Sequence, residues 1–319
     1  MLPRRKFLSV MGVCTAAAAF GQAVRPLKAE ASTGLAQAGI SLGFSLYGMK
    51  SIPLAESLAF CRELGYEHVE LCLNSGFPSE PTVFSAQSRM ATAAQLQQLG
   101  LAVPCLMVLM SLTADDEAHR KSLELISVAG RLAVDVVPAQ PPILETVLGG
   151  SPAKWPEQRS LMADRLQDWA KAAESAGTAI ALKAHIGSAV NSPERLLWLL
   201  EQVPSPSLHI AYDYSHFQLQ GMDLEQTLRP LLPRTRFIHV KDSEGTAEKF
   251  RFLLPGAGGT DYVKYFSLLQ QLGYTGPVCV EVSGQVSGQP GYDARAAARQ
   301  CFESLNGARQ KAAGLSGRN

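Results

Sequence analysis

The amino-acid sequence predicts a single (β/α)8-barrel domain. Short apolar runs rich in strand-forming residues alternate with amphipathic runs of helical period, eight times in order, between residues 40 and 305. The predicted strands are continuously apolar, which indicates parallel strands buried on both faces. A chain of eight such units matches the size of a (β/α)8 barrel, which usually needs about 250 residues.

Each predicted element has a local signal. The strands are expected at 40–46, 69–73, 102–110, 132–137, 179–184, 208–212, 236–240 and 277–282. The helices are expected at 53–64, 86–99, 115–130, 155–176, 224–232, 261–272 and 292–305, with one more starting at Ser192 and Pro193. Glycine directly follows several of them, as at Gly65 and Gly100, and is typical of a helix end. The Pro- and Gly-rich segment 138–156 is the longest connection, where we expect a lid or binding loop.

An open doubly wound sheet is the alternative fold. That fold usually has a glycine-rich phosphate loop after its first strand. Here the corresponding residues are Tyr47, Gly48, Met49 and Lys50, which do not form such a loop. The barrel is therefore the favoured architecture.

The composition excludes several classes of protein. A 46% hydrophobic content with 18% charged residues suits one large core, and the formal net charge of +1 offers no basic surface for nucleic acid. No apolar run is long enough to span a bilayer. Beyond residue 31 the cysteines are scattered and form no C-x-x-C motif, so we expect buried thiols.

Residues 1–31 have the pattern of a signal peptide. Arg4 and Arg5 precede an apolar run from Phe7 to Phe20, and Ala29-Glu30-Ala31 is a suitable cleavage site, with Gly21-Gln22-Ala23 as the competitor. The Arg-Arg-x-Phe-Leu pattern resembles a twin-arginine export signal, and an ordinary Sec signal is the alternative. We therefore expect a periplasmic protein whose barrel domain occupies residues 32–319.

Titratable residues gather at the carboxyl ends of the predicted strands, where a (β/α)8 barrel carries its active site. The strand-end residues are Glu70, Lys183, His185, Asp213, His216, His239, Lys241, Asp242 and Glu281. Polar groups in apolar strands are costly unless they are used, so most of this set is a candidate site. Asp242 is expected to cap a loop or helix, and His68 is expected at the surface.

Several motifs resemble the xylose-isomerase-like TIM-barrel superfamily over nearly all of the mature chain. They are Asp213-x-x-His216, Phe237-Ile238-His239-Val240-Lys241-Asp242, Pro255-Gly256-x-Gly258, and Gly273-Tyr274-x-Gly276-Pro277-Val278-x-Val280-Glu281. The resemblance implies a divalent metal site (Mn, Mg or Zn), with Asp213, His239 and Glu281 as ligands. It also implies substrate contacts from His216, and we add His185, Lys241 and Glu70 to the candidate substrate-binding set.

One ligand position departs from the family. Lys183 stands where the family has a glutamate on the fifth strand, and a protonated lysine cannot ligate a metal. Three alternatives stay open. The Lys183 ammonium replaces the metal charge, or a neutral Lys183 acts as a base, or three ligands with His185 or water still hold a metal.

The resemblance implies a sugar isomerase or epimerase that removes a proton next to a carbonyl, with Lys183 and Glu281 as the facing catalytic pair. A keto-sugar or keto-glycoside lyase or dehydratase is the first alternative, and a non-catalytic sugar-binding barrel is the second. We expect a small-molecule sugar as partner and neither nucleic acid nor a membrane span. The sequence leaves a homo-oligomer open.

Overall fold

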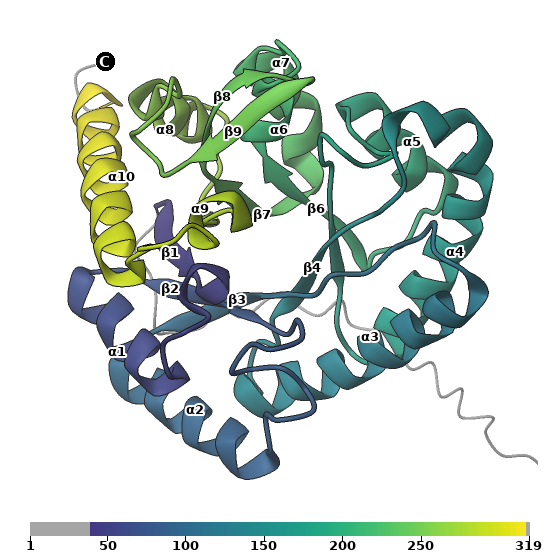
Figure 1. Ribbon diagram of the computed structural model, residues 1–319, viewed down its shortest axis with the longest axis horizontal. Helices are drawn as coiled ribbons and strands as arrows, with labels where there is room; N and C mark the ends of the chain where they lie inside the picture. The colour runs from purple at the N-terminus through teal and green to yellow at the C-terminus, as the bar shows by residue number, and fades with distance from the viewer. Residues whose placement is uncertain (1–38, 317–319) are drawn as a thin grey trace, which may run out of the picture. The chain divides into compact units, whose positions relative to one another are not determined.

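Eight parallel strands close into a barrel in the computed structural model, which describes residues 39–316 of the chain. Around the barrel the strand order is β1, β10, β7, β6, β5, β4, β3, β2 (Figure 1). Their bounds are β1 (Ser41–Ser45), β2 (His68–Cys72), β3 (Ala102–Met107), β4 (Ile143–Val147), β5 (Ile180–Lys183), β6 (Leu208–Asp213), β7 (Thr235–Val240) and β10 (Pro277–Val280). The predicted (β/α)8 barrel is confirmed.

Eight longer helices form the outer ring around the strands (Figure 1). They are α1 (Leu54–Leu64), α2 (Ala86–Leu99), α3 (Asp116–Val136), α4 (Trp155–Ser175), α5 (Pro193–Gln202), α7 (Leu224–Leu231), α8 (Tyr262–Gln271) and α10 (Ala294–Ser316). Shorter turns are α6 (Tyr214–Gln218), α9 (Gly284–Ser287), η1 (Leu46–Met49), η2 (Pro152–Lys154) and η3 (Leu232–Arg234). Gly65 ends α1 with a φ of 104°, a left-handed conformation that glycine adopts without a steric cost.

The fourth strand lies elsewhere than expected. Residues 132–136 continue helix α3, because Ala129, Leu132 and Val136 extend its buried face at spacings of three and four. Gly130 does not end the helix; a Cβ there would lie 2.7 Å from the Cβ of Ala176, so glycine allows the close approach of a neighbouring segment. The actual strand, β4, lies inside the segment that we expected to be a lid.

A two-stranded antiparallel hairpin, absent from the sequence expectation, follows β7. It consists of β8 (Asp242–Thr246) and β9 (Lys249–Leu253). The Asp242 carboxylate accepts hydrogen bonds from the backbone N–H groups of Gly256, Gly258 and Thr260 at 2.8, 2.9 and 3.3 Å. Asp242 therefore caps the loop after the hairpin, as expected.

The inside of the barrel has an apolar floor. Cys105, Phe237 and Cys279 are buried together with Ile143 packed against them. The five cysteines of the described residues are all free and buried, which confirms their expected role as small hydrophobic side chains. The expectation that His68 lies at the surface is wrong. The His68 ring is buried and packs against Gly43. A Cβ added at Gly43 would lie 2.0 Å from this ring, so only glycine leaves room for it.

The predicted signal peptide, residues 1–31, lies outside the described residues. Within residues 39–316, none of the helices combines the length and the apolar character that crossing a membrane requires.

Candidate functional site

A buried charged layer lies at the carboxyl ends of the barrel strands. Glu70 comes from β2, Glu145 from β4, Lys183 from β5, Asp213 from β6 and His239 from β7, and Lys241 and Glu281 directly follow β7 and β10. The structure thus brings together Lys183, Asp213, His239, Lys241 and Glu281 from the set proposed from sequence. Glu145 is an addition that the sequence analysis did not find.

Lys183 is surrounded by acceptors. Its Nζ lies 2.9 Å from Glu145 Oε1, 3.1 Å from Glu281 Oε2 and 3.0 Å from His239 Nδ1. The contacts with His239 and Glu281 are hydrogen bonds, and the contact with Glu145 is an ion pair. Lys183 and Glu281 touch directly, so they do not face each other across a substrate, and the expected arrangement of this catalytic pair is corrected.

Lys241 also contacts Glu281. Its ammonium is bonded to Asp213 Oδ2 and donates to Glu281 Oε2 at 2.7 Å. Its remaining side faces the Phe252 ring, with 5.0 Å between Nζ and the ring centroid. Glu281 Oε2 is therefore shared between two ammonium groups.

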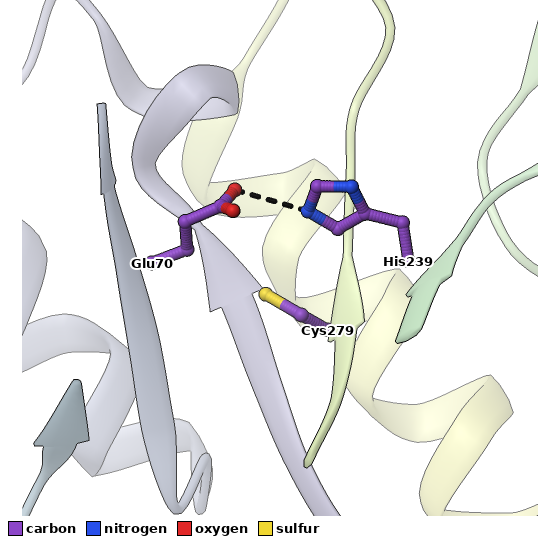
Figure 2. Close-up of side chains that lie close together, drawn as sticks. All are labelled: Glu70, His239 and Cys279. Atoms are coloured by element: carbon purple, nitrogen blue, oxygen red, sulfur yellow. Dashed lines mark hydrogen bonds and ion pairs between the residues drawn. The ribbon is translucent and has the colours of Figure 1, made fainter. Parts of the chain in front are cut away.

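His239 links the charged layer to a deeper carboxylate. Its Nε2 lies 3.0 Å from Glu70 Oε2, which also accepts from the Ser45 hydroxyl at 2.5 Å. Figure 2 shows this contact, with Cys279 beside the pair. Because Nε2 faces Glu70, the Nδ1 atom of His239 faces Lys183. Glu70 is fully buried behind this ring, where its partners are His239 and Ser45, and its expected role as a substrate contact stays a prediction.

The two lysines and the carboxylates shift one another's pKa values. Burial alone would lower the pKa of Lys183, but Glu145 and Glu281 outweigh it and raise that pKa well above its ordinary value. Burial alone would raise the pKa of Glu281, but the two ammonium groups hold it well below its ordinary value. Lys183 is therefore a fixed cation and not a neutral base, and Glu281 is ionised.

Asp213 and His239 are shifted for similar reasons. Burial would raise the pKa of Asp213, but Lys241 and His216 hold it well below its ordinary value. Burial would lower the pKa of His239, but Glu70 outweighs this effect and raises it.

Two further histidines lie beside the charged layer. The His185 and His216 rings are 4.2 Å apart, and His216 Nε2 lies 3.4 Å from Asp213 Oδ2. Burial and the neighbouring His216 lower the pKa of His185 to about 3, so it is neutral. Its Nδ1 accepts from the Gly187 N–H at 3.1 Å, which leaves Nε2 as its N–H donor.

Aromatic side chains surround this layer. Phe252, from the β8–β9 hairpin, packs on His216 with ring centroids 5.2 Å apart and also covers Lys241, so both are almost fully buried. Tyr47 stacks on Phe77 at 5.5 Å, and burial together with the charge of Glu281 raises the pKa of Tyr47. Among the four carboxylates of the charged layer, Glu281 alone has a partly accessible side chain, 13% exposed.

Two clusters of donor atoms in the site could in principle hold a divalent metal. One ligand atom each from Asp213, His239 and Glu281 lies within 4.8 Å of the others, so these residues have the spacing of a metal site. The lysines, however, already bond to one donor atom of each of the three residues, and a metal would need lone pairs at about 2.0–2.2 Å. The residues as placed do not fit a metal. The second cluster, Glu70, His239 and Cys279, has a thiol whose pKa burial raises well above its ordinary value.

A (β/α)8 barrel with a charged layer at its strand ends defines a class of catalytic scaffolds. The chain matches the xylose isomerase-like TIM barrel family over residues 58–305 and belongs to that family.

Three similar proteins illustrate the range of the family. The L-ribulose-5-phosphate 3-epimerase UlaE of Salmonella heidelberg (strain SL476) is 24% identical over 256 residues, covering 76% of this chain and 87% of that protein. The inosose dehydratase of Geobacillus thermodenitrificans (strain NG80-2) is 27% identical over 140 residues, covering 39% of this chain and 47% of that protein. The crystal structure of the IOLI protein with a bound zinc atom shares the fold, with a TM-score of 0.72, 19% identity, and coverage of 85% of this chain and 98% of that chain.

Sequence reasoning missed Glu145 because it assigned the fourth strand to the end of α3. The signal was present, since Ile143-Leu144-Glu145-Thr146-Val147 is a short run of strand formers with one carboxylate at its centre. Phe252 was also missed, because nothing local indicates that a residue of a hairpin will fold back over Lys241.

Proposed function

We propose that this protein is a sugar isomerase or epimerase that removes a proton from the carbon next to a carbonyl. One observation carries the proposal. Glu281, the accessible carboxylate of the charged layer, is held ionised between two buried ammonium groups. An ionised carboxylate can accept a proton, and fixed cations beside it stabilise the negative charge of an enediolate. The name of the UlaE relative, a sugar epimerase, supports the same reaction class.

The proposed steps use residues of this chain. Glu281 takes the proton, the C–H electron pair forms the C=C bond of an enediolate, and the oxygen gains negative charge. The ammonium groups of Lys183 and Lys241, both beside Glu281, stabilise this negative charge electrostatically. Return of the proton from Glu281 to the neighbouring carbon, with the hydroxyl proton moving to the former carbonyl oxygen, gives the isomer. Delivery of a proton to the same carbon by a second acid on the other face, while Glu281 keeps the one it removed, gives the epimer.

A lyase or dehydratase is the second candidate. The same proton removal, followed by loss of a leaving group from the next carbon, releases water or an alcohol. The match to an inosose dehydratase over 140 residues supports this alternative. It differs from isomerisation in the mass of the product.

The test is proton exchange in D2O with a panel of unphosphorylated ketoses and keto-glycosides. NMR should show deuterium entering the carbon next to the carbonyl of at least one substrate, and mass spectrometry separates isomers from elimination products. Glu281→Gln should abolish exchange, and Glu303→Gln, an exposed glutamate on α10, is the matched control. A folded protein that binds a sugar by calorimetry but exchanges no proton in the panel would indicate a sugar-binding barrel instead.

We also propose that the protein is exported to the periplasm by the twin-arginine pathway. The pattern at Arg4, Arg5, Phe7 and Leu8 supports this. Replacing both arginines by lysine should keep the full-length protein in the cytoplasm, whereas unchanged secretion would indicate the Sec pathway.

A further inference from the structure

We propose that the ammonium groups of Lys183 and Lys241 together replace the divalent cation expected in this barrel family. This inference deepens the proposed function by naming the cation of its site. The contacts of the two lysines carry it, because together they reach all three residues that a metal would need.

The two ammonium groups occupy the space between the three metal-ligand candidates. Lys183 Nζ is 3.0 Å from His239 Nδ1, and Lys241 Nζ is bonded to Asp213 Oδ2. Both approach Glu281 Oε2, at 3.1 and 2.7 Å. A metal bound by the same three atoms would lie among these contacts, where two positive charges already stand.

The net charge of the layer also matches that of a metal site. Two glutamates and one aspartate around a divalent ion would sum to minus one. Glu145, Asp213 and Glu281 around the two ammonium groups also sum to minus one. Glu70 does not enter this sum, since it is paired with His239 on the opposite side of the ring. A divalent metal added to this layer would change its net charge from minus one to plus one and would lie next to two ammonium groups that repel it.

The two lysines differ in what they can do. Lys183 contacts Glu145, Glu281 and His239 and is almost fully buried, so it serves as a counter-charge. Lys241 has two oxygen partners among the described residues and an aromatic ring on its remaining side. Lys241, whose remaining side faces this ring, stabilises a substrate oxygen by its charge, in the role that a metal would otherwise have.

The first experiment uses the natural protein, produced in medium with Mn²⁺ and Zn²⁺ and purified without chelator. Metal analysis should find far less than one ion per chain, and calorimetry with MnCl2 or ZnCl2 should show no saturable binding. One tightly held ion per chain that survives gel filtration would overturn the inference. The metal content is measured without a substrate. A bound metal would therefore overturn this inference without affecting the proposed function, and a failed exchange assay would overturn the proposed function without affecting this inference.

A second experiment converts the site. Lys183→Glu with Lys241→Met removes both ammonium groups and supplies a carboxylate on β5, so this double variant should bind one Mn²⁺ or Zn²⁺ per chain. The exposed pair Lys264→Glu with Lys311→Met makes the same charge change and should bind none. A converted protein with native circular dichroism that binds no metal would contradict the placement of the ammonium groups at the metal position. If the converted protein does not fold, the metal content of the natural protein decides alone.

Discussion

Lys183→Met is the most informative single change to the charged layer. The Lys183 side chain is 3% exposed and that of Glu145, its partner at 2.9 Å, is 1% exposed. Glu145 has no other ion-pair partner among the described residues, whereas Glu281 keeps Lys241 and His239 keeps Glu70. The variant therefore leaves one buried carboxylate without a counter-charge. Breaking a buried pair in this way costs about 3–5 kcal/mol, which corresponds to a fall in Tm of roughly 10 °C in a domain of this size.

The pH dependence of this loss has a definite sign. Burial raises the pKa of Glu145, and Lys183 is the group that opposes this most. In the variant the folded-state pKa rises further above the unfolded value, so protonation relieves the cost. A group with a raised folded pKa contributes stability at low pH and loses it as pH rises, so the deficit should be smaller near about pH 5 than near about pH 8.

The assay is thermal and urea unfolding of four proteins: natural, Lys183→Met, Glu145→Gln and the double variant. The double variant should regain at least half of the stability lost in Lys183→Met, because the unpaired carboxylate is gone. Lys241→Met is the matched control and should cost less, since Asp213 keeps His216 and Ser215. A loss below about 1 kcal/mol in Lys183→Met, or strictly additive losses in the double variant, would refute the buried-pair reasoning.

Three further predictions concern the surroundings of the site. Phe252→Ala uncovers Lys241, so kcat/KM in the deuterium-exchange assay should fall at least about tenfold, and unchanged kinetics would remove Phe252 from the site. Glu70→Gln removes the main group that raises the pKa of His239, so NMR titration should find that pKa lower than in the natural protein; no change would mean that the ring does not depend on Glu70. Burial lowers the pKa of His68 to about 3. Between about pH 6.5 and 3 this histidine is therefore neutral in the folded protein and protonated in the unfolded chain. Stability should therefore fall as pH drops from about 6.5 toward 3, by at most about 5 kcal/mol from this residue, and His68→Phe should flatten that part of the urea-unfolding profile.

Much of the fold could be predicted because hydrophobic periodicity is a local property. Seven of the eight strands and the order of the helices follow from runs of apolar residues and from glycines at helix ends. The fourth strand could not be placed in the same way. An apolar run such as Leu132–Val136 suits a buried helix face as well as a buried strand, and only packing against the neighbouring segment at Ala176 decides for the helix.

The sequence places Lys183, Asp213, His239, Lys241 and Glu281 at strand ends, and parallel strands in a barrel all end at one mouth. How these charges pair follows from the closed barrel and cannot be read from the sequence. Contacts between Lys183 and Glu145, or between Lys241 and Asp213, join residues 38 and 28 positions apart, as their numbers show. Such pairs depend on strand register and on side-chain reach across the barrel, and a buried charge takes whichever partner the closed barrel brings within about 3 Å.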